Sequence, residues 1–339
     1  MKKLSVIVPC YNVEQYIDRC MESLVNQTLD KSEYEIILVD DASEDSTWEH
    51  IESWEKQYPE LVIAVHCDEN GKMGRARNIG LGYSSGEYIG YVDSDDWVEP
   101  EMFKTMSDIA VKNNQDIVVC NSIRDRGSDF VKDTEETGIR VNCVNINSDD
   151  LRKDFIVDMP MQYSVWNKLI RRSLMIDNNI YFPENVAYED IFFGTLLHLY
   201  AERVAYVDVT FYHYYVNPHS TVLQKNADYH KDIMTSNIML LEELKRRGAW
   251  EHFHDELELD MLFTWYLGTV KVICLRYDNP PYDMFCKLKR DVLELMPGCT
   301  DNPYIGGCMK EFYQLLVQLL ACDVSREDLN IVAQNFKKV

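Results

Sequence analysis

Three carboxylates stand within four residues at the end of a short apolar run. The run Tyr88–Val92, which follows Gly86, predicts a buried strand, and Asp93, Asp95 and Asp96 come directly after it. Burying unpaired carboxylates is costly, so we expect them at a strand end, either in solvent or on a cation. Hard oxygen ligands suit Mg²⁺ or Mn²⁺, which proteins commonly share with substrate phosphates. A solvated acidic turn is the alternative interpretation.

A basic segment precedes this strand. Lys72, Arg75 and Arg77 lie close together in the stretch 70–78, at the start of a predicted helix. The amino end of a helix already favours an anion, and the cations strengthen that preference. The segment therefore indicates a phosphate-binding position, and a solvated basic helix face is the alternative.

The elements that must position these residues alternate along the chain. Apolar runs predict strands, and residues at helical spacing follow them, so we expect βαβ units and a parallel sheet. Ligands of such sheets bind beyond the carboxyl ends of the strands, where Tyr11, Asp40 and Asp41 also fall. The expected strands are 4–9, 34–39, 61–65, 88–92 and 116–120, and the expected helices are 16–25, 48–54 and 74–84.

Composition and charge narrow the function further. The 339 residues suffice for one large domain with an appendage, and the net charge of −23 argues against a nucleic-acid binder. The ten cysteines form no Cys-x-x-Cys pair, and the amino terminus reads as a strand, so we expect a cytoplasmic protein. No stretch is long and apolar enough to predict a transmembrane segment, while peripheral membrane contact at the inner face of the cell membrane remains open.

Four segments together resemble the family 2 glycosyltransferases, which transfer sugars from nucleotide-diphospho-sugars. They are Val6–Asn12, Glu35–Ser43, Ala76–Gly80 and Asp93–Trp97, in the order and spacing of that family. The resemblance covers about the first 110 residues, weakens over the next hundred and is absent from the last hundred. It implies an α/β fold of the GT-A (Rossmann-like) type, with a mixed, mostly parallel sheet flanked by helices and a helical C-terminal appendage.

The resemblance also implies a division of the chain. We expect a GT-A domain over residues 1–222, with a nucleotide-sugar-binding half over 1–115 and an acceptor-binding half over 116–222. A helical region over 223–339 follows. Its apolar stripe is typical of a core or a dimer seam, so this region is expected to bind acceptor or to allow homo-oligomers. The stripe consists of Phe312, Leu315, Leu316, Leu319 and Leu320.

Donor-binding roles follow from the resemblance, residue by residue. Pro9, Tyr11 and Glu14 would surround the nucleoside, with the Tyr11 ring against the base. Asp40 would accept a hydrogen bond from the base N–H, a contact that favours uracil. The further donor-binding residues expected from the motifs are Asn12, Asp41, Lys72 and Ser94.

The metal site is implied in the same way. Asp95 would be the direct ligand of Mn²⁺ or Mg²⁺, and Asp93 would lie nearer the ribose and a metal-bound water. Arg77 would lie close to both carboxylates and to the diphosphate. A cation and an arginine would stabilise the negative charge that develops on the leaving diphosphate.

A Trp-x-Lys-Leu segment and a later Glu-Asp pair resemble the polysaccharide-type members of the family. Asp190 would be the catalytic base of an inverting transfer, and Glu189 would orient it or bind acceptor hydroxyls. Simple capping of a helix that begins near residue 188 is the alternative for this pair. Trp166 is expected on the acceptor side. Lys168 would reach the diphosphate or acceptor, or else be a surface lysine beside a buried tryptophan.

The segment after residue 205 departs from the family pattern. Tyr206–Val209 and Phe211–Val216 predict a β-hairpin, and a loop with Pro218 and His219 follows it. Relatives carry an arginine near position 215 and a glycine where His219 stands, so a phosphate contact from this loop is in doubt. His219 is still a candidate to approach the metal or diphosphate.

These observations predict an inverting, metal-dependent glycosyltransferase with a UDP-sugar donor and a saccharide or lipid-linked acceptor. A nucleotidyltransferase would need a glycine-rich, lysine-containing signature after its first strand, where Pro9–Asn12 stands instead. A catalytically silent nucleotide-sugar-binding protein is the other alternative. The identity of the sugar does not follow from the sequence.

Overall fold

The computed structural model describes residues 2–125, 139–217, 220 and 223–336, and they form two compact units. The first unit contains Met1–Asn147, Met161–Asn185 and Phe193–Asn217. The second contains Ser148–Pro160, Val186–Phe192 and Pro218–Val339. The helix α7 (Glu189–Tyr200) contributes its first turn to the second unit and the remainder to the first.

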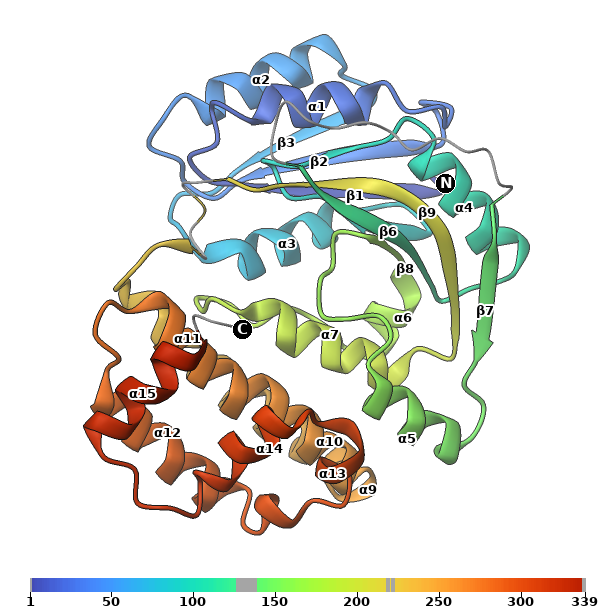
Figure 1. Cartoon of the computed structure of the whole chain (residues 1–339). Coiled ribbons are helices and arrows are strands. Elements are labelled where there is room, and N and C mark those ends of the chain that lie inside the picture. Colours follow the sequence, from blue (N-terminus) through green and yellow to red (C-terminus); the bar gives the residue numbers. More distant parts are fainter. Residues whose placement is uncertain (1, 126–138, 218–219, 221–222, 337–339) are drawn as a thin grey trace. The chain divides into compact units, whose positions relative to one another are not determined.

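One mixed sheet forms the centre of the first unit (Figure 1). Its strands run in the order β3-β2-β1-β4-β8-β6-β9-β5, with β7 paired to β9. The pairs β1–β2, β2–β3, β1–β4 and β6–β9 are parallel. The predicted α/β fold class is confirmed. The strands are β1 (Leu4–Cys10), β2 (Tyr34–Asp40), β3 (Val62–His66), β4 (Tyr88–Tyr91), β5 (Trp97–Val98), β6 (Ile117–Asp125), β7 (Val141–Asn145), β8 (Lys168–Arg171) and β9 (Arg203–Tyr215).

Helices cover both faces of the sheet, which explains why β1 and β2 are buried along their whole length. Figure 1 shows α1 (Ile17–Val25) and α2 (Thr47–Gln57) on one face and α3 (Lys72–Tyr83) on the other. The α1 and α2 face shares one apolar core with α4 (Met102–Lys112), through residues such as Val6 and Phe103. On the other face α3 lies close to β1. A Cβ on Gly80 would be 2.4 Å from Ile7 Cγ2, so only glycine permits this approach.

The strand register aligns the carboxyl ends of β1 to β4. Cys10 pairs with Asp40, Asp40 pairs with His66, and Ile7 pairs with Tyr91. The residues that follow these strands therefore share one edge of the sheet, which we call the donor edge.

The predicted hairpin after residue 205 is wrong. Residues 203–215 form the single strand β9, and Thr210, at the expected turn, stays in the ladder opposite Asn121. Register shifts between Cys120 and Ser122 absorb the extra residues of β9, so the chain continues without a turn. The sequence also gave no signal for β8, which pairs antiparallel with both β4 and β6.

The second unit is helical, as predicted for the C-terminal part of the chain. Its core contains Leu240, Leu257, Trp265 and Phe285. The expected apolar stripe is only partly buried, because Leu316 is buried whereas Leu315 is 60% exposed. No helix among the described residues is long and apolar enough to cross a membrane. The helices are α5 (Asp149–Asp158), α8 (Asp232–Arg246), α9 (Ala249–His252), α10 (His254–Met261), the π-helix η3 (Leu262–Leu267), α11 (Gly268–Arg276), α12 (Tyr282–Leu295), α13 (Ile305–Cys308), α14 (Glu311–Gln318) and α15 (Arg326–Phe336).

Candidate active site

The three carboxylates that follow β4 differ in their surroundings. Asp96 is fully buried and accepts hydrogen bonds from the Tyr212 hydroxyl at 2.6 Å and the Tyr215 N–H at 2.7 Å. It therefore joins the acidic turn to β9. Asp93 and Asp95 are partly exposed on the same turn. The side chains that can meet a ligand are thus those of Asp93 and Asp95.

Arg77 lies beside Asp93. Its Nη2 is 2.9 Å from Asp93 Oδ1, and only 3% of the arginine side chain is exposed. The guanidinium also lies over the ring of Phe182, 5.2 Å from its centroid. Because Arg77 lies on α3 and Asp93 lies on the turn that follows β4, the donor edge itself brings the two together. The arginine is held on two sides, so its charge is preorganised.

Two residues that the sequence analysis missed hold Asp95. Asn217 Nδ2 donates to Asp95 Oδ2 at 3.1 Å, and Arg19 Nη2 donates to the Asp95 carbonyl oxygen at 2.6 Å. Arg19 also lies over the ring of Tyr215, 4.5 Å from its centroid. Asn217 is 122 residues away from Asp95 and carries no local motif, so spacing alone gave no signal for it.

The electrostatics of this turn favour a cation. Burial raises the pKa of Asp95, and the nearby charge of Asp93 raises it further. Burial and both neighbouring carboxylates also raise the pKa of Asp96 to about 9. The ionised forms of Asp95 and Asp96 therefore cost free energy in these surroundings, and a nearby divalent cation would offset that cost.

The residues present fit a metal that is shared with a ligand. A carboxylate has about four lone-pair sites, so Asp93 and Asp95 keep acceptor sites beyond the bonds described above. In the part of the chain that the structure describes, no group of three or more His, Cys, Asp or Glu side chains could hold a metal ion. Two carboxylates suit Mg²⁺ or Mn²⁺ when phosphate oxygens and water complete the coordination.

The other end of the donor edge combines an exposed ring with a buried carboxylate. The Tyr11 side chain is 45% exposed after β1, while Asp40 at the end of β2 is fully buried. His66 Nδ1 lies 2.7 Å from Asp40 Oδ2, and the Ser43 N–H donates to Asp40 Oδ1 at 3.3 Å. His66 contacts Trp48, with ring centroids 4.9 Å apart. The sequence analysis missed this histidine, although its place at the end of β3 could have indicated it.

Unusual backbone conformations gather at the same edge. Asn12, Ala42 and Lys72 have φ values of 52°, 59° and 65°, in the left-handed region that non-glycine residues seldom adopt. Asn12 is fixed by two bonds, from its N–H to Ser43 Oγ at 3.0 Å and from the Glu44 N–H to its Oδ1 at 2.8 Å. Such strain is maintained by the surrounding structure and is common at functional sites.

The remaining predicted donor residues have structural partners. Glu14 Oε2 accepts from the Ser46 N–H at 3.0 Å, and Asp41 Oδ1 accepts from the Gly71 N–H at 2.9 Å, where α3 begins. Burial raises the pKa of Asp41. Pro9 and Ser94 are buried. Glu14 and Asp41 therefore shape the loops of the donor edge, and a direct role for either remains a prediction.

Lys168 and Trp166 lie in the first unit on and before β8. The Lys168 ammonium is almost fully buried and donates to the Ser164 carbonyl and to Asn167 Oδ1. Trp166 stacks on Tyr212 with ring centroids 4.4 Å apart. Because Tyr212 is also the residue that bonds Asp96, Trp166 packs behind the acidic turn.

Asp190 and Glu189 lie in the first turn of α7, within the second unit. Glu189 is buried, Asp190 is partly exposed, and the Ile191 N–H donates to Asp190 Oδ1 at 3.0 Å. Tyr188, directly before the helix, has a φ of 63°. The base role of Asp190 remains a prediction. His219 lies outside the described residues.

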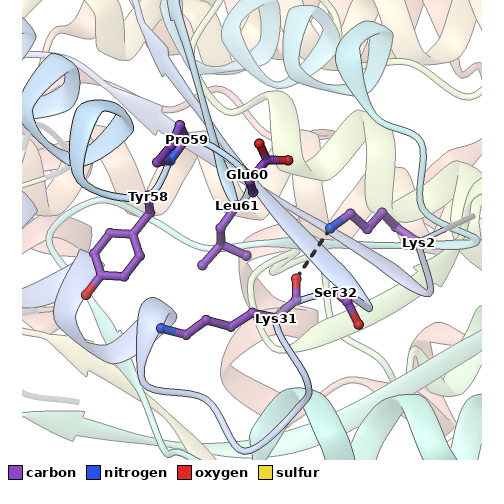
Figure 2. A pocket seen from close by; sticks show the side chains of 7 residues that line it. All are labelled: Lys2, Lys31, Ser32, Tyr58, Pro59, Glu60 and Leu61. Atoms are coloured by element: carbon purple, nitrogen blue, oxygen red, sulfur yellow. Dashed lines mark hydrogen bonds between the residues drawn. The ribbon is translucent and has the colours of Figure 1, made fainter.

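A cavity of about 400 Å³ lies at the amino ends of β1 to β3 (Figure 2). Its lysines already have partners, because Lys2 Nζ donates to the Lys31 carbonyl at 3.3 Å and Lys31 Nζ lies 4.7 Å from the Tyr58 ring centroid. Ligands of such sheets bind at the opposite edge, so we do not assign the active site here. The cavity is lined by Lys2, Lys31, Ser32, Tyr58, Pro59, Glu60 and Leu61.

Comparisons with known proteins agree on one family. The family model described as glycosyl transferase family 2 matches residues 5–189. The glycosyltransferase named EpsH of Bacillus subtilis is 32% identical over 267 residues, which cover 75% of this chain and 73% of EpsH. The poly(ribitol-phosphate) beta-N-acetylglucosaminyltransferase TarS of Staphylococcus aureus is 30% identical over 217 residues, which cover 63% of this chain and 35% of TarS.

A solved structure has a similar fold. The crystal structure of S. aureus TarS residues 1–349 in complex with UDP-GlcNAc gives a TM-score of 0.69 at 22% sequence identity. The alignment covers 100% of this chain and 92% of that one. The fold of this chain is therefore that of a TarS-type GT-A domain with its helical C-terminal part.

Proposed function

The chain belongs to the family 2 glycosyltransferases, and we propose that it transfers a sugar from a UDP-sugar to a saccharide or lipid-linked acceptor in bacterial polysaccharide synthesis. One observation carries this proposal: Arg77 and the two carboxylates Asp93 and Asp95 meet at the edge of the sheet that also holds Tyr11 and Asp40. Two carboxylates that could hold a cation, an arginine for the diphosphate and an exposed ring for the base lie along one edge and match the parts of a nucleotide-diphospho-sugar.

The residues proposed to bind the nucleoside support UDP as the nucleotide of the donor. The exposed Tyr11 ring is available to stack on a base, whereas Asp40 is fully buried beside His66 and Ser43 and would meet the base only if the side chains that cover it move. A carboxylate accepts from the N3–H of uracil, whereas cytosine presents no N–H at that position. The related TarS domain was crystallised with UDP-GlcNAc and with UDP, which supports the same choice here.

The diphosphate end is where negative charge grows as the sugar leaves. We propose that Asp95 and Asp93 hold Mn²⁺ or Mg²⁺, which when bound supplies charge stabilisation to the diphosphate. Arg77 contributes a second fixed positive charge, and Phe182 and Asp93 keep it oriented before the donor arrives. Groups that are oriented in advance stabilise a developing charge most effectively.

The acceptor is attacked through one of its hydroxyls, and we propose that Asp190 removes the proton of that hydroxyl. Attack opposite the leaving diphosphate inverts the anomeric centre. Residues 1–115 would bind the donor, residues 116–222 the acceptor, and residues 223–339 would support the acceptor side. Relatives named for poly(ribitol phosphate) suggest a polyol-phosphate or saccharide chain as acceptor. We propose that the reaction takes place in the cytoplasm or at the inner face of the membrane, as predicted from the sequence.

A binding panel followed by turnover tests this function. Purified protein is mixed with Mn²⁺ and UDP-glucose, UDP-N-acetylglucosamine, UDP-galactose or GDP-mannose, and the thermal shift is measured. A true donor raises the melting temperature by mass action, and UDP release in the presence of poly(ribitol phosphate) or a saccharide acceptor then reports transfer.

The variant Asp190→Asn separates the steps. It should bind the donor as the wild type does and lose transfer by about 10²–10⁴-fold. A stabilising shift without any transfer or hydrolysis, for every donor and acceptor, would favour a silent binding protein. The absence of any shift with every sugar nucleotide would refute the proposed function.

A further inference from the structure

The segment that carries Asp190 is held by side chains from the C-terminal part of the chain. Val186–Phe192 belongs to the second unit, together with the residues from Pro218 onward. The Ala187 N–H donates to Asp232 Oδ2 at 3.0 Å, and Ser236 Oγ donates to the Tyr188 carbonyl at 2.9 Å. Together with His230, which bonds the Tyr188 side chain, Asp232 and Ser236 form what we call the base clamp.

Two members of the base clamp share one face of α8. Asp232 and Ser236 are four residues apart, so their side chains lie one above the other on the helix. Asp232 accepts from the N–H of Ala187, and Ser236 donates to the carbonyl of Tyr188 itself. Ser236 is fully buried, so water does not compete for its bond. The backbone on both sides of Tyr188 is thereby fixed to a regular helix.

The third member is a buried histidine with a defined tautomer. His230 is fully buried, and its Nε2 lies 2.8 Å from the Gln224 carbonyl oxygen. A carbonyl only accepts, so Nε2 carries the proton and Nδ1 is left to accept from the Tyr188 hydroxyl at 2.7 Å. Burial raises the pKa of Tyr188, so the phenol keeps its proton and donates.

The residue held in this way has a strained backbone. Tyr188 has a φ of 63°, a conformation that a bulky residue rarely adopts. Glu189 and Asp190 follow at once and begin α7, so the backbone at Tyr188 sets the direction in which the first turn of α7 leaves. Strain of this kind persists only where neighbouring groups determine it, and the base clamp supplies those groups.

We propose that His230, Asp232 and Ser236 are positioning residues that orient Asp190 for proton removal from the acceptor. This inference rests on the proposed function, in which Asp190 is the base. The C-terminal helical part of the chain thus has a share in the transfer step, because it fixes the turn from which the base projects. None of the three positioning residues is assigned a contact with substrate.

Small side-chain truncations in the base clamp test this role. Ser236→Ala and Asp232→Ala should lower kcat for UDP release from UDP-N-acetylglucosamine with Mn²⁺ and acceptor by about ten- to a hundredfold, the size expected for a small misplacement of a catalytic group. The donor Kd, measured by calorimetry, should stay within twofold. Ser236→Thr and Asp232→Asn keep the bonding oxygen and should restore most of kcat.

Matched controls separate positioning from folding. Thr235→Ala removes a hydroxyl from the exposed neighbour of Ser236 and should leave kcat unchanged. Tyr188→Phe removes only the bond to His230 and should give an intermediate loss. Hydrogen–deuterium exchange should become faster in the peptide 186–192 of Ser236→Ala, with the helices α10 to α15 still protected.

The outcomes distinguish this inference from the function on which it rests. If Asp190→Asn is inactive while Ser236→Ala and Asp232→Ala keep wild-type kcat, the positioning role is refuted and the proposed function stands. A loss of donor affinity that parallels the loss of kcat, or no rescue by Ser236→Thr and Asp232→Asn, would also refute it. If Asp190→Asn transfers sugar at the wild-type rate, the base assignment and this inference fail together.

Discussion

Each unit of the molecule contains a dense group of acidic residues, and the two groups have different surroundings. In the first unit Asp93, Asp95 and Asp96 follow β4 at the donor edge. In the second unit α10 carries a trio of its own, and all three side chains are buried. The second trio is Glu256, Glu258 and Asp260.

The partners of the helical trio belong to its own unit. Glu256 Oε1 accepts from the Tyr304 hydroxyl at 2.7 Å, and Glu258 Oε2 accepts from Asn302 Nδ2 at 2.9 Å. Both donors are neutral and lie between α12 and α13, so the bonds fasten a connecting segment onto α10. These carboxylates stabilise the packing of helices.

The helical trio has a charged neighbour in Lys153, whose Nζ lies 3.8 Å from Glu256 Oε1, but the strand-end trio has a closer one and two partly exposed carboxylates. Arg77 bonds Asp93, and Asn217 bonds Asp95. Of the three carboxylates, only Asp96 is fully buried and bonded to β9. A helix points successive side chains around its axis, whereas the end of a parallel strand directs them to the place where other strands also end. Three neighbouring acidic residues therefore do not by themselves indicate a ligand-binding site. Their position at the carboxyl end of a strand does indicate one.

The largest effect is expected at Asp95, where a substitution tests whether the strand-end trio binds a metal. Asp95→Asn keeps the bond to Asn217 and removes a charge of the proposed metal site, so Mn²⁺-dependent donor binding should be lost. Turnover should fall by about 10³-fold, since several kcal/mol of charge stabilisation disappear. Calorimetry with the donor, with and without Mn²⁺, measures the change.

The matched control is the corresponding change in the other trio. Glu258→Gln should bind donor and metal as the wild type does. Equal Mn²⁺ dependence in Asp95→Asn and wild type would show that the strand-end trio is not a metal site.

A smaller effect is expected at Arg77. Arg77→Lys keeps the positive charge but loses the planar group that lies over Phe182 and bonds Asp93. We expect kcat to fall by about ten- to a hundredfold, with the fold intact, because the charge is no longer held in one place. Steady-state kinetics and circular dichroism check both statements, and wild-type kinetics in this variant would contradict the preorganisation argument.

The sequence predicted the first half of the fold well, for a physical reason. Strands such as 4–9 and 34–39 are continuous apolar runs because both faces of the sheet are covered, and alternating helices dictate a parallel arrangement. The same rule placed Tyr11, Asp40 and the acidic turn at one edge, because parallel strands end together.

What could not be predicted depends on contacts between distant residues. Asn217 and Arg19 meet Asp95 across 122 and 76 positions, and no local pattern encodes either contact. The hairpin prediction at 206–216 failed because the irregular residues of β9 are accommodated by register shifts against β6, a distant partner strand, and not by a turn. The base clamp was missed for a related reason, since its residues lie on helices whose apolar pattern reports only packing.

The affinity for Mn²⁺ should depend on pH at the strand-end trio. Burial and mutual repulsion raise the pKa values of Asp95 and Asp96, so protons compete with a cation at this turn at a higher pH than they would at ordinary aspartates. The affinity should therefore rise as the pH rises through the raised pKa values, by up to about tenfold per pH unit. Calorimetry in buffers of different ionisation enthalpy detects the released protons, and a pH-independent affinity would contradict the raised pKa values.

The smallest effect is expected at Glu258 in the helical trio, and it concerns the stability of the fold. Burial raises the pKa of Glu258 above its ordinary value, although the bond from Asn302 opposes this. The folded state thus binds the proton more tightly than the unfolded chain, so wild-type stability should decline as the pH rises from the ordinary pKa of a glutamate through the raised one.

Glu258→Gln keeps an acceptor for Asn302 and carries no charge. Its melting temperature should exceed that of the wild type by about 1–3 °C at pH 7.5, and the gain should shrink at pH 4.5. A loss of stability at pH 7.5 would mean that the ionised carboxylate stabilises α10, and the two acidic trios would then differ less than their surroundings imply.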